Sequence, residues 1–214
     1  RLRKKPWIAT AMAEFKDFVL LKPDPAPAGR WSEMFGRTAP LQVELGSGKG
    51  AFIAGIAERR PDINFVGIEG QADVLYYAAV KVKERNLPNV RLLVADVATI
   101  GELFAPREVD RLYINFCDPW PKNRHAKRRL TYRTFLAQYR IIMAPSHRLC
   151  FKTDNRALFE FSLAEFAAAG LPVENITYDL AAGGRTDNIR TEYEIKFSTR
   201  GEKNRGASLS NMDF

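Results

Sequence analysis

The fold is decided by residues 43–50, which read Val43-Glu44-Leu45-Gly46-Ser47-Gly48-Lys49-Gly50. An apolar run, Gln42–Leu45, precedes the glycines, and a segment with helical periodicity, Gly50–Arg59, follows them. Glycine permits a tight turn and lets the backbone approach a ligand closely. The stretch therefore predicts a strand, a ligand-binding turn and a helix, the first unit of an α/β sheet.

From Leu41 onward, short apolar runs alternate with helix-period segments, a pattern typical of βα units in a parallel sheet. The expected strands are Gln42–Leu45, Asn64–Ile68, Val90–Ala95, Arg111–Phe116, Arg148–Lys152, Val173–Leu180 and Thr191–Ser198. The expected helices are Gly50–Arg59, Ala72–Arg85, a short one near Thr99–Phe104, Thr131–Met143 and Arg156–Ala168. The last two strands lack a clear helix between them. We therefore expect an α/β fold: a mostly parallel seven-stranded sheet with helices on both faces and an antiparallel last strand.

The two ends of the chain differ from its centre. Residues 1–40 combine a basic start, a possible helix near Thr10–Leu20 and a Pro-rich stretch, so we expect an N-terminal basic arm and linker. Residues 41–200 form the expected catalytic domain. Residues 201–214 are polar, and we expect a loosely held tail.

The composition limits the class of protein. Lys and Arg number 33 against 25 Asp and Glu in 214 residues, a net charge of +8, which indicates a polyanionic partner and nucleic acid first. No window approaches the ~20 apolar residues of a membrane span, so we expect a cytoplasmic protein with no membrane partner. Cys117 and Cys150 stand far from any CxxC or Cys/His cluster, which favours buried thiols and no metal site.

Carboxylates stand at or near the ends of the first four expected strands. They are Glu44, Glu69, Asp96 and Asp118, each separated from the next by about the length of one βα repeat. Because the carboxyl ends of parallel strands line the ligand crevice of an open α/β sheet, we expect these side chains to converge on one ligand. Any one of them could instead begin a turn or cap a helix. Because four carboxylates recur in this way, a shared ligand-binding site is favoured over four separate turns or caps.

The glycine turn allows more than one ligand. A Walker phosphate loop fails, because positions 43 and 50 lack the required glycine and hydroxyl residue. A dinucleotide fingerprint is formally met by Gly46, Gly48 and Ala51, which keeps an NAD-dependent oxidoreductase open as an alternative. Glu44 counts against it, because a carboxylate beside the turn repels a pyrophosphate at the helix N-terminus.

S-adenosyl-L-methionine suits an acidic, glycine-lined crevice better. It carries a cationic sulfonium, an ammonium group and ribose hydroxyls, and it has no phosphate. Its ribose can donate two hydrogen bonds to Glu69, and its adenine amino group can donate to a strand-end group such as Asp96.

Five motifs occur in one order between Leu41 and Phe197. They are Val43–Gly50, Gly67-Ile68-Glu69, Cys117–Lys122 running into Arg124–Leu130, Phe151–Asn155, and Thr191–Glu194. In these motifs the chain resembles the bacterial tRNA (guanine-N7-)-methyltransferase family of class I S-adenosylmethionine-dependent enzymes. The Asp-Pro-Trp-Pro run followed by the basic stretch is the specific part of the resemblance, whereas the glycine turn is generic to methyltransferases.

The resemblance implies that the α/β sheet has the Rossmann-like methyltransferase fold. It also implies methyl transfer from S-adenosylmethionine to N7 of a guanine in the tRNA variable loop. It also implies roles for named positions. The cofactor-binding residues would be Glu44, Gly46, Gly48, Glu69, Asp96 and Asp118, with Asp118 also catalytic. The substrate-contacting residues would be Lys122, Asp154, Thr191, Glu192, Tyr193 and Glu194.

A basic segment follows the fourth expected strand. Cations crowd into residues 122–133 with no acid among them, and we expect RNA contacts from Arg124, His125, Lys127, Arg128 and Arg129. Trp120 could stack on a splayed base or cover the sheet edge. A non-catalytic RNA-binding module and, from the Asp-Pro dipeptide, a DNA amino-methyltransferase remain alternatives. A monomer and a homodimer are equally compatible with the sequence.

Overall fold

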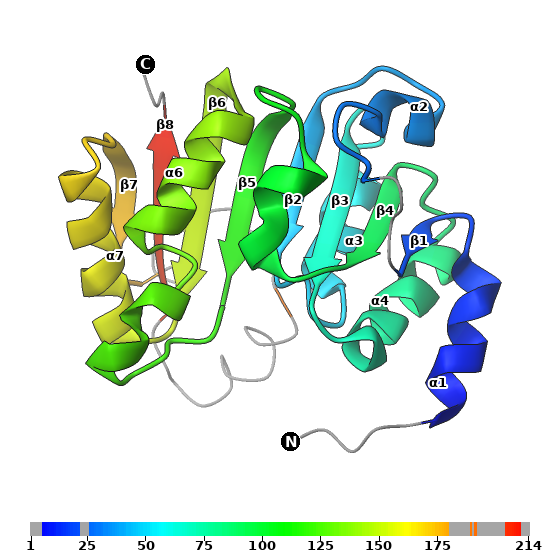
Figure 1. Cartoon of the computed structure of the whole chain (residues 1–214), viewed down its shortest axis with the longest axis horizontal. Coiled ribbons are helices and arrows are strands. Elements are labelled where there is room, and N and C mark those ends of the chain that lie inside the picture. Colours follow the sequence, from blue (N-terminus) through cyan, green and yellow to red (C-terminus); the bar gives the residue numbers. More distant parts are fainter. Residues whose placement is uncertain (1–5, 22–25, 180–188, 190, 192–203, 211–214) are drawn as a thin grey trace.

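A computed structural model describes residues 6–21, 26–179, 189, 191 and 204–210. Within these ranges the strands form one sheet in the order β1-β4-β3-β2-β5-β6-β8-β7 (Figure 1). The strands are β1 (Val19–Leu20), β2 (Leu41–Leu45), β3 (Asn64–Glu69), β4 (Val90–Val94), β5 (Val109–Asn115), β6 (Met143–Thr153), β7 (Val173–Thr177) and β8 (Arg205–Ser210). Neighbours from β1 to β6 pair in parallel, and β8 is antiparallel to both β6 and β7.

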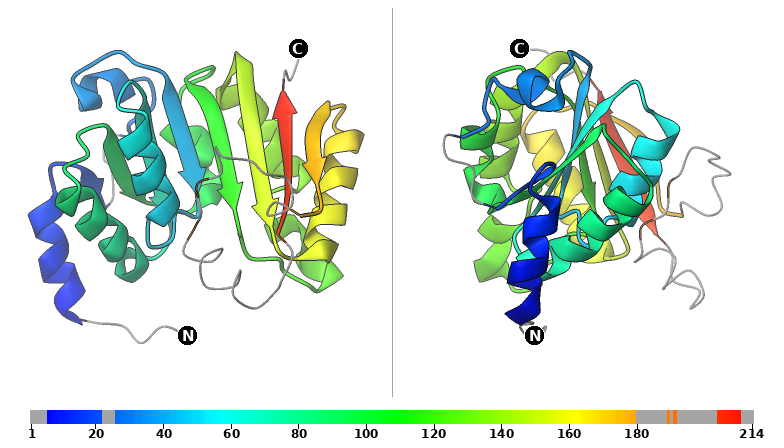
Figure 2. Two further views of the ribbon diagram at one scale, coloured as in Figure 1. Left: turned by 180° about the vertical axis from the view of Figure 1, so that it is seen from behind. Right: turned by 90° about the vertical axis from the view of Figure 1, so that its right-hand side faces the viewer.

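Helices cover both faces of this sheet, as the edge-on view shows (Figure 2). The α-helices are α1 (Pro6–Ala11), α2 (Trp31–Phe35), α3 (Ala51–Arg59), α4 (Ala72–Glu84), α5 (Ile100–Leu103), α6 (Arg133–Ile142) and α7 (Arg156–Ala168). The 3-10 helices are η1 (Met12–Phe15), η2 (Val97–Thr99) and η3 (Asn123–Arg128). In the described part of the chain, no helix is both long and apolar enough to span a membrane.

The core has two halves because successive side chains of a strand point to opposite faces. On β3, Val66 and Ile68 belong to the half packed by α5, α6 and α7, whereas Phe65 belongs to the half packed by α1, α3 and α4. Central strands buried on both faces read as continuous apolar runs, which explains why the sequence located them well. The α6 helix is amphipathic instead, with Leu136 and Tyr139 among its buried residues.

The predicted fold class is confirmed: the sheet is mostly parallel, has helices on both faces and ends in an antiparallel strand. Six of its strands coincide with predicted strands, and β1 and β8 are additions within the described residues. The helix expected over Thr10–Leu20 is wrong at its C-terminal end. There the chain adds β1 to the sheet edge, and the Leu92 amide donates to the Phe18 carbonyl at 2.8 Å.

The C-terminal prediction also needs correction. Arg205–Ser210 forms β8 and pairs with two neighbours, although the sequence predicts a loose tail there. This strand is short in apolar residues, so its place comes from backbone pairing and not from a hydrophobic pattern. The strand expected over Thr191–Ser198 lies outside the described residues except for Thr191, which is buried.

Candidate functional site

The sheet order reverses direction between β2 and β5. The chain runs outward from β2 to β3 and β4, and then returns to place β5 on the other side of β2. In open α/β sheets such a switch point leaves a ligand crevice at the carboxyl ends of the strands. These ends form the lower edge of the sheet in Figure 1. The predicted cofactor-binding residues lie along this edge.

The glycine turn connects β2 to α3 at the switch point. The amides of Gly46 and Ser47 both donate to the Ile68 carbonyl at 2.9 Å, which fixes the turn against the end of β3. Gly50 has φ +81°, and a Cβ there would lie 2.5 Å from the Ala78 Cβ of α4. Gly50 therefore lets α3 begin in close contact with α4. The sequence indicated the turn but not this packing role.

Glu44 points into the interior beneath the turn. It is only 3% exposed, and its Oε1 accepts a hydrogen bond from Asn115 Nδ2 at 2.9 Å. Asn115 ends β5 and is 5% exposed. Asn115 is not among the residues predicted for the site, although the polar residue that ends the apolar run 112–114 was a usable signal.

Two buried polar atoms, one on Asn115 itself and one on the glycine turn, lack a hydrogen-bond partner among the described residues. They are Ser47 Oγ and Asn115 Oδ1. Buried polar groups are normally paired, and an orphan costs about 1–3 kcal/mol. Both atoms belong to segments that meet at the carboxyl edge, so a polar ligand bound there can supply the missing partners.

Glu69 ends β3 and binds the neighbouring backbone. Its two carboxylate oxygens accept from the amides of Gly48 at 3.2 Å and Gln71 at 3.0 Å. Burial raises the pKa of Glu69, and the negative charge of Asp118 adds to this rise, although the backbone amides oppose it. Glu69 therefore lies at the carboxyl end of β3 with both of its oxygens held by the turn backbone.

Asp96 lies two residues beyond β4. Its side chain caps η2, because its Oδ1 accepts from the Ala98 amide at 2.9 Å. The residue is exposed. The sequence allowed any one of the four carboxylates to cap a helix, and Asp96 does so. It also lies at the carboxyl edge of the sheet, after β4.

Asp118 is exposed and occupies a sharply bent loop after β5. The residues around it include two with left-handed backbone, Phe116 at φ +52° and Trp120 at φ +43°. Non-glycine residues in this region store strain, which clusters at functional sites. Beneath the loop, burial raises the pKa of the Cys117 thiol to about 12, and the charge of Asp118 contributes.

Arg129 holds this loop from below. It is 8% exposed, its Nε donates to the carbonyls of Pro119 at 3.2 Å and Trp120 at 3.3 Å, and its Nη2 donates to Trp120 at 3.0 Å. Its guanidinium also lies 4.2 Å from the centre of the Phe161 ring. These partners differ from the RNA phosphates that the sequence predicted for Arg129. The structure gives it a loop-holding position instead.

The rest of the basic segment forms η3 and its flanks. Lys122, Arg124, Lys127 and Arg128 are exposed, whereas His125 is half-buried. Trp120 is enclosed by two of its neighbours, with the Arg128 guanidinium 4.8 Å from its ring centre and His125 edge-on at 5.8 Å. The indole is thus half-buried within the basic segment.

The remaining substrate positions lie near the end of β6. Asp154 is half-buried directly after this strand, and its carbonyl accepts from Arg205 Nη1 at 2.6 Å. Lys152 of β6 is the direct partner of Asn115 on β5, and its ammonium group lies 5.4 Å from the Phe52 ring centre. Thr191 is buried, whereas Glu192, Tyr193 and Glu194 fall outside the described residues.

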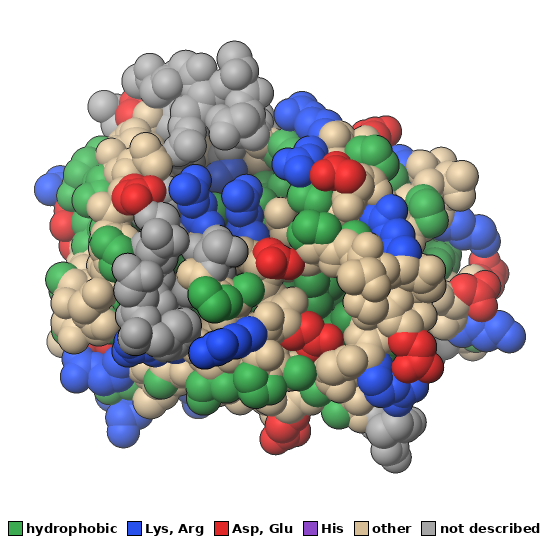
Figure 3. All heavy atoms as spheres, turned by 90° about the horizontal axis from the view of Figure 1, so that it is seen from above, with side chains coloured by type: hydrophobic (Ala, Val, Ile, Leu, Met, Phe, Trp, Pro, Cys, Tyr) green, Lys and Arg blue, Asp and Glu red, His purple; other side chains and the backbone are tan. Residues whose placement is uncertain are grey.

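The opposite edge of the sheet has a different character. Figure 3 looks onto the side where the parallel strands begin, and there Lys and Arg side chains are mixed with Asp and Glu. The Arg60–Asp62 ion pair, at 2.9 Å, follows α3 at this edge. In the portion of the chain that is described, no cluster of three or more His, Cys, Asp or Glu residues could hold a metal ion.

Comparison with known proteins decides the family. Residues 38–206 match the family described as "Putative methyltransferase". The chain is 46% identical over 202 residues to the tRNA (guanine-N(7)-)-methyltransferase of Streptococcus suis, covering 94% of this chain and 95% of that protein. The chain belongs to the tRNA (guanine-N7-)-methyltransferase family. A family member from Halalkalibacterium halodurans is 47% identical over 201 residues, covering 94% of this chain and 91% of that one.

Solved structures support the fold of this family member. A structure described as an antibiotic-related methyltransferase superposes with a TM-score of 0.62 at 18% identity, covering 85% of this chain and 92% of that one. A SAM-dependent methyltransferase from Aquifex aeolicus gives a TM-score of 0.58 at 15% identity, covering 98% and 100%. The predicted family resemblance and the Rossmann-like methyltransferase fold are both confirmed.

Proposed function

We propose that this protein is a tRNA (guanine-N7-)-methyltransferase that uses S-adenosylmethionine and modifies a guanine of the tRNA variable loop. The observation that carries the proposal is the 46% identity over 94% of the chain to a relative of that name. Membership of a methyltransferase family favours this activity over the NAD-dependent oxidoreductase that the glycine turn also allowed. The charge of +8 suits a polyanionic substrate.

The residues at the carboxyl edge fit S-adenosylmethionine. When bound, this cofactor supplies an electrophilic methyl group on a sulfonium. Glu69 would accept from the ribose hydroxyls, Asp96 would accept from the adenine amino group, and Glu44 and Asp118 would offset the positive charge of the amino acid end. The orphaned Ser47 Oγ and Asn115 Oδ1 indicate that a polar ligand belongs beside these carboxylates.

In methyl transfer to guanine N7, the main task of the protein is to position the guanine against the methyl group. Guanine N7 carries a lone pair at neutral pH, so no general base is needed to prepare the nucleophile. Alignment of reacting atoms can contribute ~7–11 kcal/mol in favourable cases. Asp118 would accept hydrogen bonds from the N1/N2 edge of the guanine or from the cofactor ammonium, and its charge would favour the cation that develops on the purine.

The substrate side of the site rests on the exposed cations and the end of β6. Lys122, Arg124, Lys127 and Arg128 would neutralise tRNA phosphates, with His125 beside them, because such contacts hold RNA in register. Asp154 and the segment Thr191–Glu194 would complete recognition of the guanine edge, as the family resemblance implies.

The test is transfer of labelled methyl from S-adenosylmethionine to unmodified tRNA, followed by nucleoside analysis of the product. We expect label in N7-methylguanosine. Tight tRNA binding without label would instead support a non-catalytic RNA-binding module, and label on another nucleoside would assign a different methyltransferase activity.

Asp118→Asn tests the catalytic assignment, because it keeps the size and removes the charge. We expect a loss of turnover of at least about tenfold with tRNA binding retained. Asp62→Asn is the matched control, since Asp62 is exposed at the opposite edge of the sheet. Turnover of Asp118→Asn equal to that of the control would contradict the role of Asp118.

A further inference from the structure

The side-chain amide of Asn115 has a fixed orientation at the switch point between β2 and β5. Its Nδ2 donates to Glu44 Oε1 at 2.9 Å, and both side chains are buried. Turning the amide over would place its oxygen against the carboxylate, where neither atom can donate a hydrogen bond. Asn115 Oδ1 therefore points away from Glu44, and it has no hydrogen-bond partner among the described residues.

The missing partner of Asn115 Oδ1 is a hydrogen-bond donor, because an amide oxygen can only accept. Buried polar atoms are normally paired with protein, water or ligand. Asn115 ends β5 at the carboxyl edge, where the switch point of the sheet leaves a ligand crevice. The structure therefore indicates a ligand that brings an N–H or O–H group to this edge.

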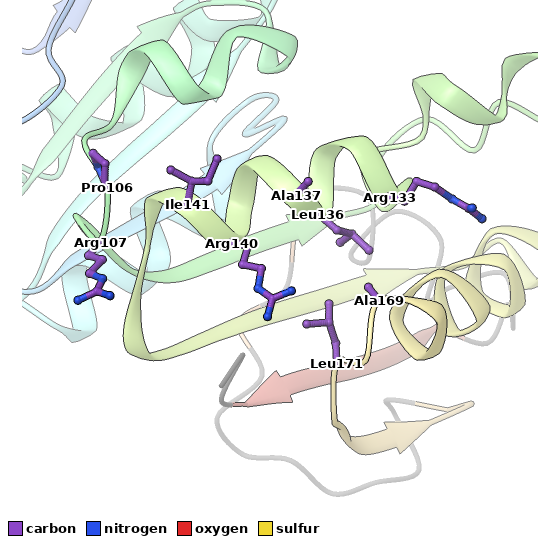
Figure 4. A pocket seen from close by; sticks show the side chains of 9 residues that line it. All are labelled: Pro106, Arg107, Arg133, Leu136, Ala137, Arg140, Ile141, Ala169 and Leu171. Atoms are coloured by element: carbon purple, nitrogen blue, oxygen red, sulfur yellow. The ribbon is translucent and has the colours of Figure 1, made fainter. Parts of the chain in front are cut away.

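A larger cavity elsewhere in the molecule lacks such a feature. It has a volume of about 420 Å³ and lies beside α6, lined in part by Leu136 and Leu171 (Figure 4). Arg133 at one end of it is already paired with Glu165 at 2.8 Å. None of the described side chains that line it has a buried polar atom without a partner. The unmet hydrogen bond of Asn115 thus points to the carboxyl edge and not to this cavity.

The order of the strands along the carboxyl edge selects the donor. From β4 through β3 and β2 to β5, the edge carries Asp96, Glu69, Glu44 and Asn115 in turn. In the proposed function, Asp96 accepts from the adenine amino group and Glu69 accepts from the ribose. S-adenosylmethionine has one further donor, the ammonium group of its amino acid end. This group is left for the junction of β2 and β5.

We propose that Asn115 is a cofactor-binding residue that accepts from the ammonium group of S-adenosylmethionine through Oδ1 while it holds the Glu44 carboxylate through Nδ2. The proposal rests on the proposed function. A charged donor makes a stronger hydrogen bond than a neutral one. The positive charge would also reduce the cost of burying the Glu44 carboxylate, which is only 3% exposed.

A second hydrogen bond between β2 and β5 has the same diagonal geometry, farther from the carboxyl edge. Glu44 is the direct strand partner of Tyr113, and Asn115 reaches it from two residues farther along β5. Gln42 is likewise the direct partner of Arg111. Tyr113, two residues beyond Arg111, donates to Gln42 Oε1 at 2.8 Å. Tyr113 is buried, so Y113F removes a comparable hydrogen bond without touching the edge and is the matched control.

The test measures the binding of two ligands by calorimetry. They are S-adenosylhomocysteine and deamino-S-adenosylhomocysteine, which lacks only the α-amino group. We expect N115A to weaken binding of the first about 10- to 100-fold, the usual effect of losing a hydrogen bond to a charged group. Binding of the deamino ligand should stay nearly unchanged. Y113F should lower Tm and leave the ratio of the two affinities at its wild-type value.

An exchange of the two side-chain groups keeps the test decisive if a single variant fails to fold. E44Q/N115D retains both side-chain sizes, the net charge and one amide beside one carboxylate, so the hydrogen bond can form in the opposite sense. N115D alone places two carboxylates together and should lose stability. E44Q/N115D should regain it and should bind S-adenosylhomocysteine more tightly than the deamino ligand, because a carboxylate at position 115 then meets the ammonium.

Other results would overturn the inference. An equal loss for both ligands in N115A would mean that Asn115 only supports the fold or holds a water molecule. Unchanged binding of both ligands with a raised KM for tRNA would assign Oδ1 to the guanine. E44Q/N115D that folds but binds both ligands equally would exclude the ammonium contact. Wild-type protein that binds neither S-adenosylmethionine nor S-adenosylhomocysteine would overturn the proposed function as well, whereas the other outcomes overturn this inference alone.

Discussion

Replacing Arg129 separates two roles that an arginine in the basic segment can have. Arg129→Lys keeps the positive charge, but an ammonium group cannot reproduce the planar fork that reaches Pro119 and Trp120 or its contact with Phe161. If Arg129 holds the Asp118 loop, the variant should lose stability and turnover. If it binds RNA phosphate, the variant should retain both and weaken tRNA binding.

The expected magnitude follows from the contacts. A hydrogen bond to a charged group contributes about 1.5–3 kcal/mol, and Arg129 makes one through Nη2 and a shared one through Nε. Allowing for partial replacement by lysine, we expect a loss of about 2–4 kcal/mol in the free energy of unfolding. For a chain of this size, that loss lowers Tm by about 5–15 °C. A displacement of Asp118 by about 1 Å can cost about 100-fold in turnover.

The assay is urea or thermal unfolding together with methyl transfer to tRNA. Arg124→Lys is the matched control, since Arg124 is exposed in the same basic segment. We expect Arg129→Lys to lower Tm and kcat with little change in KM for tRNA, and the control to leave Tm unchanged. A normal Tm with a raised KM for tRNA and a smaller salt slope in Arg129→Lys would refute the loop-holding role and restore the RNA contact.

Three further predictions concern the glycine turn, Glu69 and Cys117. Gly50→Ala should destabilise the protein by about 2–4 kcal/mol in urea unfolding, because φ is +81° and the new Cβ would lie 2.5 Å from the Ala78 Cβ, whereas Gly36→Ala, which meets no atom within 4 Å, should cost less. Because the pKa of Glu69 is raised, its ionised, hydrogen-bond-accepting form is lost earlier as pH falls; S-adenosylhomocysteine affinity measured by calorimetry should decline with acidification in the wild type, and this part of the decline should be absent in Glu69→Gln. With a thiol pKa of about 12, Cys117 should resist iodoacetamide at pH 8 in the folded protein and react on unfolding, as mass spectrometry of the labelled peptide would show; rapid labelling of the native protein would contradict the raised pKa.

The sequence predicted the central fold well because its strands are buried on both faces. Continuous apolar runs such as β2 and β3 leave little ambiguity, and the glycine turn after β2 fixed the position of the first unit. The strands near the edges of the sheet were harder to predict from the sequence. The short β1 and the polar β8 are held by backbone pairing with strands distant in sequence, and no local pattern reports such pairing.

The sequence also predicted part of the candidate site, namely its carboxylates. The structure places the four carboxylates at the carboxyl edge, and the charge of Asp118 contributes to the raised pKa of Glu69. Asn115 and the burial of Arg129 were missed, because a hydrogen bond to Glu44 and a position beneath a loop depend on the tertiary arrangement. A run of cations identifies a basic segment, but it does not identify which member turns inward.

The pairing of β1 with β4 also has a consequence for how the chain folds during synthesis. Val19 is made early, yet its partner Leu92 follows only after β2, α3, β3 and α4 have been made. Until then the first segment has no sheet edge to join, so its docking is a late, non-local event. Once in place, it covers the outer edge of β4, which as a bare parallel strand would offer its open backbone groups to other chains. The N-terminal segment therefore completes this edge of the sheet and shields it in the same step.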